Sequence, residues 1–323
     1  MLLGSSLKHF KTLCVTLLVL CSGTQTSLRN SSIKVSQPAR IDIGNFESKC
    51  GNIPITDTTE MLEMASNVFQ NSRYLRILLP EGYRIPADVA RHYPVLYFND
   101  GTAVFDAGIY HLEQVVDQLI RTGDIPPIII VGIDNGACTD QTKDPLIDRA
   151  KEFLPYPDTG PASHPYAPSP AQPQGKLYPR FLIDEVMPFI EKHYRVKTGP
   201  TNTGLAGSSY GAVSALYTVI NNPDVFGKLL LESPPLWIGP NYQILREAEV
   251  CKQWPSSVYL GYGTSEGEAQ ETIINGEHLA DVFRKFRNVR FKYVEDEGAK
   301  HDFSAWARRL PEALRFLYRK EAR

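Results

Sequence analysis

Residues 203–211 read TGLAGSSYG and contain one G-x-S-x-G pattern, with Ser209 between Gly207 and Gly211. An apolar run precedes the pattern and an alanine-rich, helix-forming run follows it, so the sequence predicts a strand, a sharp turn and a helix. In such a turn the serine hydroxyl projects from the sheet, and its neighbours must be almost free of side chains because the backbone is strained and closely packed. The pattern therefore predicts that Ser209 is a nucleophile.

Ser208 stands directly before Ser209 but does not fit the pattern. Its own flanking positions would be Ala206 and Tyr210, and neither residue is glycine. A G-x-S-x-G match also occurs by chance as a small-residue turn between a strand and a helix, so the assignment depends on partner residues elsewhere in the chain.

A serine hydroxyl is a weak nucleophile at neutral pH and needs a base within hydrogen-bond reach, which a carboxylate then orients. Of the seven histidines, only His301 follows the last expected strand in a short glycine-containing loop. From that loop it could reach a serine at the end of another strand. We expect His301 to be the general base, although an ordinary surface histidine is the simpler interpretation of this residue taken alone.

Three carboxylates lie at expected strand ends between Ser209 and His301: Glu232, Glu266 and Glu268. Glu266 is the expected acid, because hydrolases mostly draw it from the later strand and the surrounding glycines (GTSEG) let the backbone turn toward the histidine. Glu268 belongs to an acidic run typical of a solvated surface. Glu232 remains an alternative, since some proteins of this type use the earlier strand. The order serine, acid, histidine is the one that alpha/beta-hydrolases use.

Nearly unbroken apolar runs read as strands that are buried on both faces. An amphipathic helix pattern over residues 110–120 lies between two of them, and strand, helix, strand is the unit of a parallel sheet. The predicted fold class is therefore α/β, with a mostly parallel central sheet flanked by helices on both faces. The expected strands are 74–79, 93–98, 128–133, 228–231, 258–260 and 289–294, and the expected helices are 110–120, 177–194 (with a kink at Pro188), 277–286 and 303–318.

The N-terminal residues 1–23 read as a signal peptide, with Lys8 and Lys11 before an uncharged run over 12–21. This run is too short to span a bilayer, and it has no polar face of the kind that a soluble helix would show. Residues 24–66 are polar and irregular, and we expect an extension that drapes over the domain, with one short helix possible at 59–65. Residues 67–323 form the expected catalytic domain of a secreted or periplasmic protein.

Charge and cysteine content exclude several classes of function. Removal of the signal peptide changes the formal net charge from −2 to −4 and leaves no basic run, so neither nucleic acid nor a membrane is an expected partner. The three remaining cysteines, Cys50, Cys138 and Cys251, allow at most one disulfide. The sequence has no CxxC or HExxH spacing, so no metal or other cofactor is expected.

The turn after the strand at 93–98 reads Asn-Asp-Gly-Thr, and Thr102 ends it. In a hydrolase of this type an amide at this place points at the reacting carbonyl, so the Thr102 amide is a candidate oxyanion donor. An ordinary Asp-Gly turn explains the same residues equally well.

Two further segments are candidates for substrate binding. Residues 156–175 contain six prolines and no periodicity, and residues 234–249 read as a loop that contains Trp237. A long irregular loop inside a compact domain often belongs to a binding site, so we expect both to rim the pocket. Arg149 and Glu152, just before the first of them, either position a substrate or form a surface ion pair.

Several segments resemble the putative esterase family of alpha/beta-hydrolases, the group that contains esterase D, enterochelin esterases and feruloyl or acetyl-xylan esterases. The resemblance covers about residues 67–320. The segments that carry it are RYLRILLPEGY, YPVLYFNDGTAVFD, FLIDEVMPFIEKHYRV, GLAGSSYGAVSALY with NPDVFG, and HDFSAWARRLPEALRFLY.

The resemblance implies an alpha/beta-hydrolase fold with Ser209 as nucleophile and His301 as base. It also implies an oxyanion hole made by the amides of Tyr210 and the residue after Gly101. Ala212 departs from the family pattern, because members usually carry a second glycine there.

The expected function is that of a secreted serine esterase, which hydrolyses a small-molecule or carbohydrate-linked ester through an acyl-enzyme. An acyltransferase that uses the same site is one alternative. A catalytically inactive exported fold that binds carbohydrate or a siderophore is another.

Overall fold

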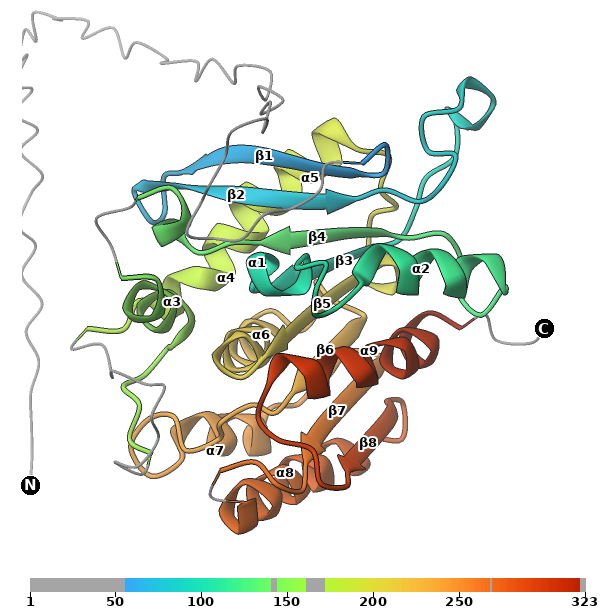
Figure 1. The fold of residues 1–323 in the computed structure, drawn as a ribbon. Coiled ribbons are helices and arrows are strands. Elements are labelled where there is room, and N and C mark those ends of the chain that lie inside the picture. Colours follow the sequence, from blue (N-terminus) through green and yellow to red (C-terminus); the bar gives the residue numbers. More distant parts are fainter. Residues whose placement is uncertain (1–55, 141–143, 161–171, 268, 320–323) are drawn as a thin grey trace, which may run out of the picture. The chain divides into compact units, whose positions relative to one another are not determined.

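The computed structural model describes residues 56–140, 144–160, 172–267 and 269–319 (Figure 1). The expected signal peptide and residues 24–55 of the expected extension lie outside the described residues, as do residues 161–171 of the proline-rich segment. Within the described part of the chain, no helix is both long and apolar enough to cross a membrane.

An eight-stranded sheet forms the centre of the domain, in the order β1-β2-β4-β3-β5-β6-β7-β8. Among the described strands only β2 runs against the others, since it pairs antiparallel with both β1 and β4 and the remaining pairs are parallel. The parallel strands therefore bring their carboxyl ends to one edge. The strands are β1 (Thr59–Ser66), β2 (Asn71–Leu78), β3 (Val95–Asn99), β4 (Ile129–Ile133), β5 (Thr203–Ser208), β6 (Lys228–Glu232), β7 (Ser257–Gly263) and β8 (Arg290–Asp296).

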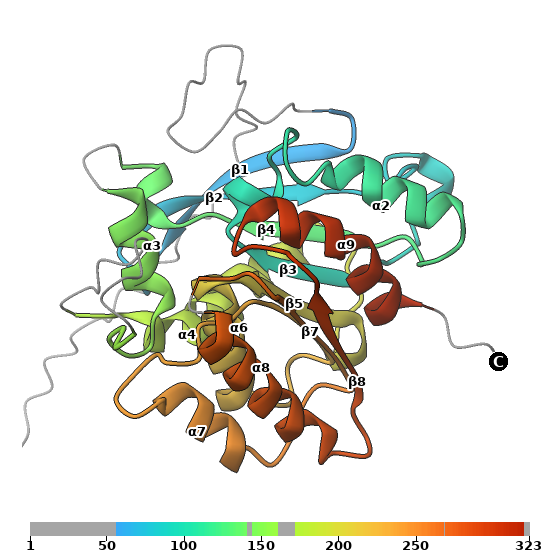
Figure 2. The ribbon, with the colours of Figure 1, turned by 60° about the horizontal axis from the view of Figure 1, so that its bottom comes forward.

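Helices cover both faces of the sheet, as the sequence predicts (Figure 2). Successive strand residues point to opposite faces, so Leu205 of β5 joins one apolar core and Ala206 joins the other. Helices α2 and α9 cover one face, and α4, α5, α6, α7 and α8 contribute to the core on the other. The helices are α1 (Gly101–Val104), α2 (Leu112–Arg121), α3 (Pro145–Phe153), α4 (Tyr178–Phe181), α5 (Met187–His193), α6 (Tyr210–Asn221), α7 (Gln243–Val250), α8 (Ala269–Arg284) and α9 (Phe303–Tyr318).

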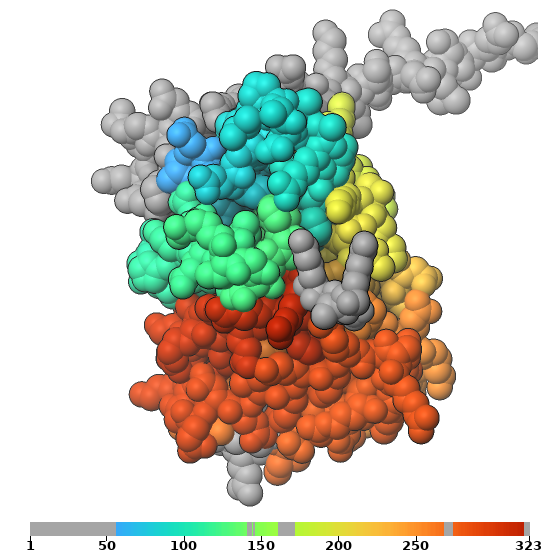
Figure 3. Space-filling model, turned by 90° about the vertical axis from the view of Figure 1, so that its right-hand side faces the viewer, coloured from blue at the N-terminus to red at the C-terminus, as the bar shows by residue number. Residues whose placement is uncertain are grey.

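The edge opposite the strand carboxyl ends lies at the right of Figure 1 and faces the viewer in Figure 3. On this face the green surface of the segment around α2 lies beside the red surface of α9 (Figure 3). The amino ends of β6, β7 and β8 bring Lys228, Ser257 and Arg290 to one hollow there.

The short helix expected at 59–65 is wrong, because these residues belong to β1. Met, Leu, Glu and Ala favour a helix locally, but β1 pairs with β2 along its whole length, from Thr59 opposite Leu78 to Ser66 opposite Asn71. Met61 joins the core on one face of the sheet, and Leu62 and Met64 join the core on the other. Tertiary pairing therefore overrides local propensity, and the sheet begins within the segment that the sequence assigned to the extension.

Two other expectations need adjustment. The helix expected at 177–194 is interrupted by a π-helical turn, Leu182–Val186, between α4 and α5. Pro188 explains the wider turn, because it has no amide hydrogen and its ring conflicts with the carbonyl four residues earlier. The loop expected at 234–249 contains the start of α7, which buries Ile244, Leu245 and Ala248 against the core.

Candidate active site

Ser209 lies in a strained turn between β5 and α6. Its φ of 54° and ψ of −126° are rare for a residue with a side chain and cost about 1–3 kcal/mol. A Cβ on Gly207 would stand 2.2 Å from the carbonyl oxygen of Gly211, and a Cβ on Gly211 would stand 2.7 Å from the Asp100 carboxylate. Close packing therefore explains both glycines of the G-x-S-x-G pattern, against backbone at Gly207 and against side chains at Gly211. The strand-turn-helix expectation is confirmed.

Ser209, His301 and Glu266 form a continuous hydrogen-bonded chain. His301 Nε2 lies 2.9 Å from Ser209 Oγ, and His301 Nδ1 lies 2.9 Å from Glu266 Oε2. With a neutral imidazole, the serine hydroxyl donates to Nε2 and the Nδ1 hydrogen is donated to the carboxylate. The three residues follow β5, β8 and β7, so the parallel sheet brings together side chains that are far apart in the sequence.

The loops that carry Glu266 and His301 pack directly against each other. The Ser265 amide donates to the Ala299 carbonyl at 2.9 Å, and a Cβ on Gly263 would stand 2.3 Å from the same carbonyl oxygen. Glu266 is 1% exposed, and one of its oxygens accepts a hydrogen bond from the Gly263 amide at 2.6 Å. This packing directs the acid toward the histidine.

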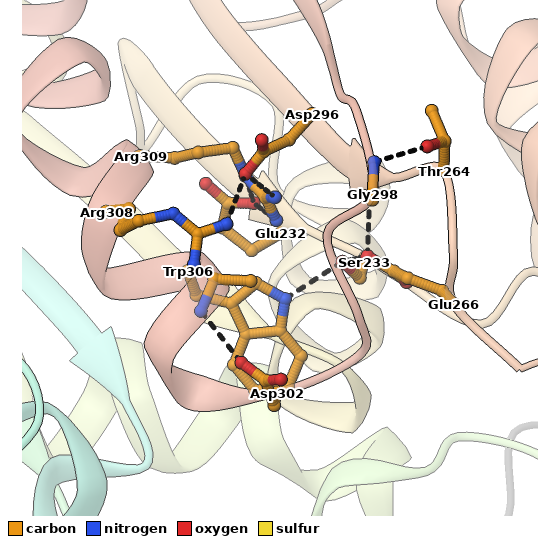
Figure 4. A network of polar contacts seen from close by, with 12 residues as sticks. Glu232, Ser233, Thr264, Glu266, Asp296, Gly298, Asp302, Trp306, Arg308 and Arg309 are labelled. Carbon is orange, nitrogen blue, oxygen red and sulfur yellow. Dashed lines mark hydrogen bonds and ion pairs between the residues drawn. The ribbon is translucent and has the colours of Figure 1, made fainter.

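Glu232, the alternative acid, is engaged elsewhere. It ends β6 and forms a buried ion pair with Arg309 of α9, with Nη2 2.6 Å from Oε2 (Figure 4). Burial raises the pKa of Glu232 to about 7, against the opposing effect of Arg309. The imidazole of His301 contacts Glu266 rather than Glu232. Glu268 lies outside the described residues.

The two candidate oxyanion donors lie at the starts of helices on neighbouring strands. Tyr210 begins α6 after β5, and Thr102 lies in the first turn of α1 after β3, which pairs with β5. The first amides of a helix have no acceptor within the helix. The Asn99 side chain joins the two turns by donating to the Gly211 carbonyl at 2.8 Å.

Arg149 and Glu152 do not form the surface ion pair that the sequence suggested. Each lies in a separate ion pair with another residue, partly buried for Arg149 and almost completely buried for Glu152. Arg149 binds Asp100 through two hydrogen bonds of 2.5 and 2.8 Å and also donates to the Ser208 carbonyl at 3.3 Å. Glu152 pairs with Arg73 at 2.6 Å, and both side chains are almost completely buried. Glu152 is therefore too buried to contact a substrate. Arg149 holds the strained turn at Ser209, called the elbow below, through the Ser208 carbonyl.

Trp237 is only 7% exposed, so little of its side chain is open to a substrate. Its indole nitrogen donates to Asp158 at 2.9 Å, and the other oxygen of Asp158 accepts from the Tyr210 hydroxyl at 2.5 Å. Sequence reasoning missed Asp158 and also Asp100, the partner of Arg149. An aspartate in a proline-rich loop and one in an Asp-Gly turn carry no signal of a distant partner.

The described residues contain no group of three or more His, Cys, Asp or Glu side chains with the arrangement of a metal site.

Comparison with solved structures identifies the fold. The BES protein from Bacillus cereus is 23% identical, with a TM-score of 0.65 over 84% of this chain and 98% of that one. The siderophore hydrolase EstB from Aspergillus nidulans is 17% identical, with a TM-score of 0.65 over 83% of this chain and 98% of that one. A ferulic acid esterase from Anaeromyces mucronatus is 20% identical, with a TM-score of 0.57 over 85% and 94%. At these identities the likeness shows a shared alpha/beta-hydrolase fold.

A family assignment rests on the sequence match. Residues 66–317 match the model of the family described as "Putative esterase". This range includes β2 to β8 and all three members of the hydrogen-bonded chain at the sheet edge. The protein therefore belongs to the Putative esterase family, with the fold of an alpha/beta-hydrolase.

Proposed function

We propose that this protein hydrolyses a carboxylic ester through an acyl-enzyme, with Ser209 as nucleophile, His301 as general base and Glu266 as the acid. The observation that carries the proposal is the pair of 2.9 Å contacts that join the three side chains. A hydrogen-bonded serine, histidine and carboxylate at strand ends is the arrangement that acyl transfer requires.

The reaction follows from this geometry. His301 Nε2 accepts the Ser209 proton while Oγ attacks the ester carbonyl, and Glu266 stabilises the resulting imidazolium. The amides of Tyr210 and Thr102 donate to the oxyanion. When the tetrahedral intermediate collapses, the ester C–O bond breaks, His301 gives its proton to the departing alcohol, and the acyl group stays on Ser209. Water then attacks the acyl-enzyme while His301 accepts a proton from it. When this second intermediate collapses, His301 returns the proton to Ser209 Oγ and the carboxylic acid is released.

The substrate proposed is a small-molecule or carbohydrate-linked ester. Similar solved structures that are described as a siderophore hydrolase and a ferulic acid esterase support this choice. An exported location is part of the proposal. It is supported by the signal-peptide pattern over residues 1–23 and by Cys138, which is disulfide-bonded, since disulfides persist in oxidising compartments.

Two measurements test the proposal. A fluorophosphonate probe should label the purified protein, and mass spectrometry should place the adduct on Ser209. Ser209→Ala should lower kcat by about 10⁶, whereas the matched variant Ser208→Ala should keep most of the activity. An adduct on Ser208 or Ser214, or no label at all, contradicts the assignment.

A panel of p-nitrophenyl esters, feruloyl and acetylated sugars and ferric siderophore esters then identifies the substrate class. Product analysis in the presence of added alcohols separates the two outcomes of the acyl-enzyme. Release of free acid as the main product supports the hydrolase, and transfer to the alcohol at low concentration would indicate an acyltransferase.

A further inference from the structure

Ser233 lies directly after β6 and holds the far side of the candidate acid. It is 1% exposed, and its hydroxyl oxygen lies 2.5 Å from Glu266 Oε1 and 2.9 Å from the indole nitrogen of Trp306 (Figure 4). An indole nitrogen can only donate, so the Ser233 oxygen accepts from Trp306. The Ser233 hydrogen is therefore left to be donated to the carboxylate.

The two carboxylate oxygens of Glu266 have different hydrogen-bond partners. Oε1 accepts from the Ser233 hydroxyl and from the Gly263 amide at 2.6 Å, and Oε2 faces His301. Two donors on one oxygen fix the rotation of the carboxylate plane, because turning it would break both hydrogen bonds. The remaining oxygen is thereby directed at the imidazole.

Trp306 contacts both His301, the proposed base, and Ser233, which binds the proposed acid. Its ring lies edge-to-face with the His301 ring, at 5.0 Å between centroids and an interplanar angle of 88°. The same indole donates to Ser233 on its other side. One side chain of α9 therefore limits the movement of both His301 and, through Ser233, Glu266.

The backbone of Ser233 is strained. Its φ is 49°, a region in which a residue with a side chain costs about 1–3 kcal/mol and which glycine adopts freely. A structural turn would tolerate glycine here. Glycine has no hydroxyl group, and the Ser233 hydroxyl lies between Trp306 and Glu266. This hydroxyl is therefore the reason for a serine in this conformation.

We infer that Ser233 and Trp306 are positioning residues that hold Glu266 in the orientation needed to polarise His301. The inference rests on the proposed function, since it assigns a role within the same site. It adds a fourth and a fifth residue to the hydrogen-bonded chain, which then runs from Trp306 through Ser233, Glu266 and His301 to Ser209.

The test compares two changes at Ser233. Ser233→Gly removes the hydroxyl and relieves the strained φ, so the released strain should offset part of the stability lost with the two hydrogen bonds, and the protein should still fold. Its kcat should nevertheless fall about 10-fold to 100-fold, because a hydrogen bond to a charged group is lost. KM should change less than about twofold, since the residue does not touch substrate. Ser233→Ala keeps the strain and should lose the same activity with a lower Tm.

Trp306→Phe offers a second route to the same contact. It preserves an aromatic ring beside His301 and removes the indole hydrogen, so kcat should fall, whereas Tm should fall by about as much as in a matched control that loses the same buried volume. The matched control is Trp254→Phe. Trp254 is also buried, and its indole nitrogen has no partner among the described residues. This control should keep the wild-type kcat.

The decisive measurement repeats Ser233→Gly in a Glu266→Gln background. A positioning role predicts that the change then costs less than about twofold in the residual kcat, because the acid it orients is already lost. Equal losses in both backgrounds, or full activity of Ser233→Gly in the wild-type background, would overturn the inference. A wild-type protein that hydrolyses no ester and takes no label at Ser209 would instead refute the proposed function.

Discussion

The Tyr210 hydroxyl donates a 2.5 Å hydrogen bond to Asp158 and so joins the residue after Ser209 to the start of the proline-rich segment. Burial, and then the Asp158 carboxylate, raise the pKa of Tyr210 above its ordinary value, so the phenol stays a neutral donor. Asp158 also accepts from Trp237, and Thr159 donates to the Trp237 carbonyl at 2.8 Å. The elbow and the two segments beside it are therefore connected through one carboxylate.

Replacing Asp158 should change substrate preference more than stability. Asp158→Ala releases both Tyr210 and Trp237, so the segments that contain Asp158 and Trp237 lose this attachment to the elbow. We expect the ratio of kcat/KM for a feruloyl ester to that for an acetyl ester to change by about fivefold or more, which corresponds to about 1 kcal/mol. Tyr210→Phe, which removes one of the two contacts, should give a smaller change in the same direction. An unchanged ratio together with a large fall in Tm would mean that Asp158 is only structural.

Glu266→Gln should lower kcat, whereas Glu232→Gln should lower the free energy of unfolding. Loss of the Glu266 charge should lower kcat by about 10⁴, because an amide neither orients the imidazole correctly nor stabilises its charged form. Glu232→Gln should retain kcat per folded molecule but lower the free energy of unfolding by about 3 kcal/mol, since Arg309 loses a buried partner. Arg309 keeps a 3.1 Å contact with Asp296, so the loss should not be larger.

Urea unfolding and ester assays on the same two preparations measure both effects. If only Glu232→Gln loses activity, the acid must be reassigned. A small loss in both variants would indicate a Ser209–His301 pair that works without a third member.

Sequence reasoning named Ser209, His301 and Glu266 as candidates because each follows a strand, and the structure brings their side chains into contact because parallel strands deliver their carboxyl ends to one edge. The relevant information was local: a five-residue pattern, a glycine-containing loop and strands visible as apolar runs. The strand β1 was missed for the opposite reason. Its residues favour a helix by themselves, and only pairing with β2 makes them a strand.

The residues that support the candidate site could not be predicted from local sequence patterns either. Ser233 contacts Glu266, 33 positions later, and Asp158 contacts Trp237, 79 positions later. Glu152 looked like a surface charge because its partner, Arg73, lies 79 positions earlier on β2. Such pairings depend on which loops meet in the folded chain, and a single sequence carries no direct record of that.

Arg149 and Glu152 are neighbours on α3, and their replacements should lower different quantities. Arg149→Lys keeps a positive charge but cannot make both hydrogen bonds to Asp100, which precedes the candidate oxyanion donor Thr102. We expect kcat to fall about 10-fold with little change in KM, because the loss of one charge-assisted hydrogen bond loosens this turn.

Glu152→Gln should leave kcat per folded molecule unchanged. It should lower the free energy of unfolding by roughly 3–5 kcal/mol, because Arg73 remains buried without its charged partner. Denaturant unfolding and ester assays of both variants check the contrast. Equal effects on kcat would show that the two ion pairs support the elbow together.

Lys228 lies at the sheet edge away from the active site, and it allows the pH dependence of stability to be tested. It lines a hollow of about 290 Å³ with Arg290 and Tyr318, and its ammonium donates to the Thr201 carbonyl. Burial, followed by the charge of Arg290, lowers the pKa of Lys228 from 10.5 to about 8. Between these two values the unfolded lysine binds a proton that the folded one has released, so the wild type gains stability as pH rises through this window.

Lys228→Met removes the titrating group, so its Tm relative to the wild type should be highest below pH 8 and should fall steadily toward pH 10.5. The variant also loses the contact with Thr201, which shifts the difference by a constant amount. The change of the difference with pH is therefore the quantity to measure, by thermal unfolding at several pH values. Lys192→Met, at an exposed position of α5, is the matched control and should show no such slope. A difference that is flat with pH, or that grows toward pH 10.5, would show that the folded Lys228 does not release its proton in this window.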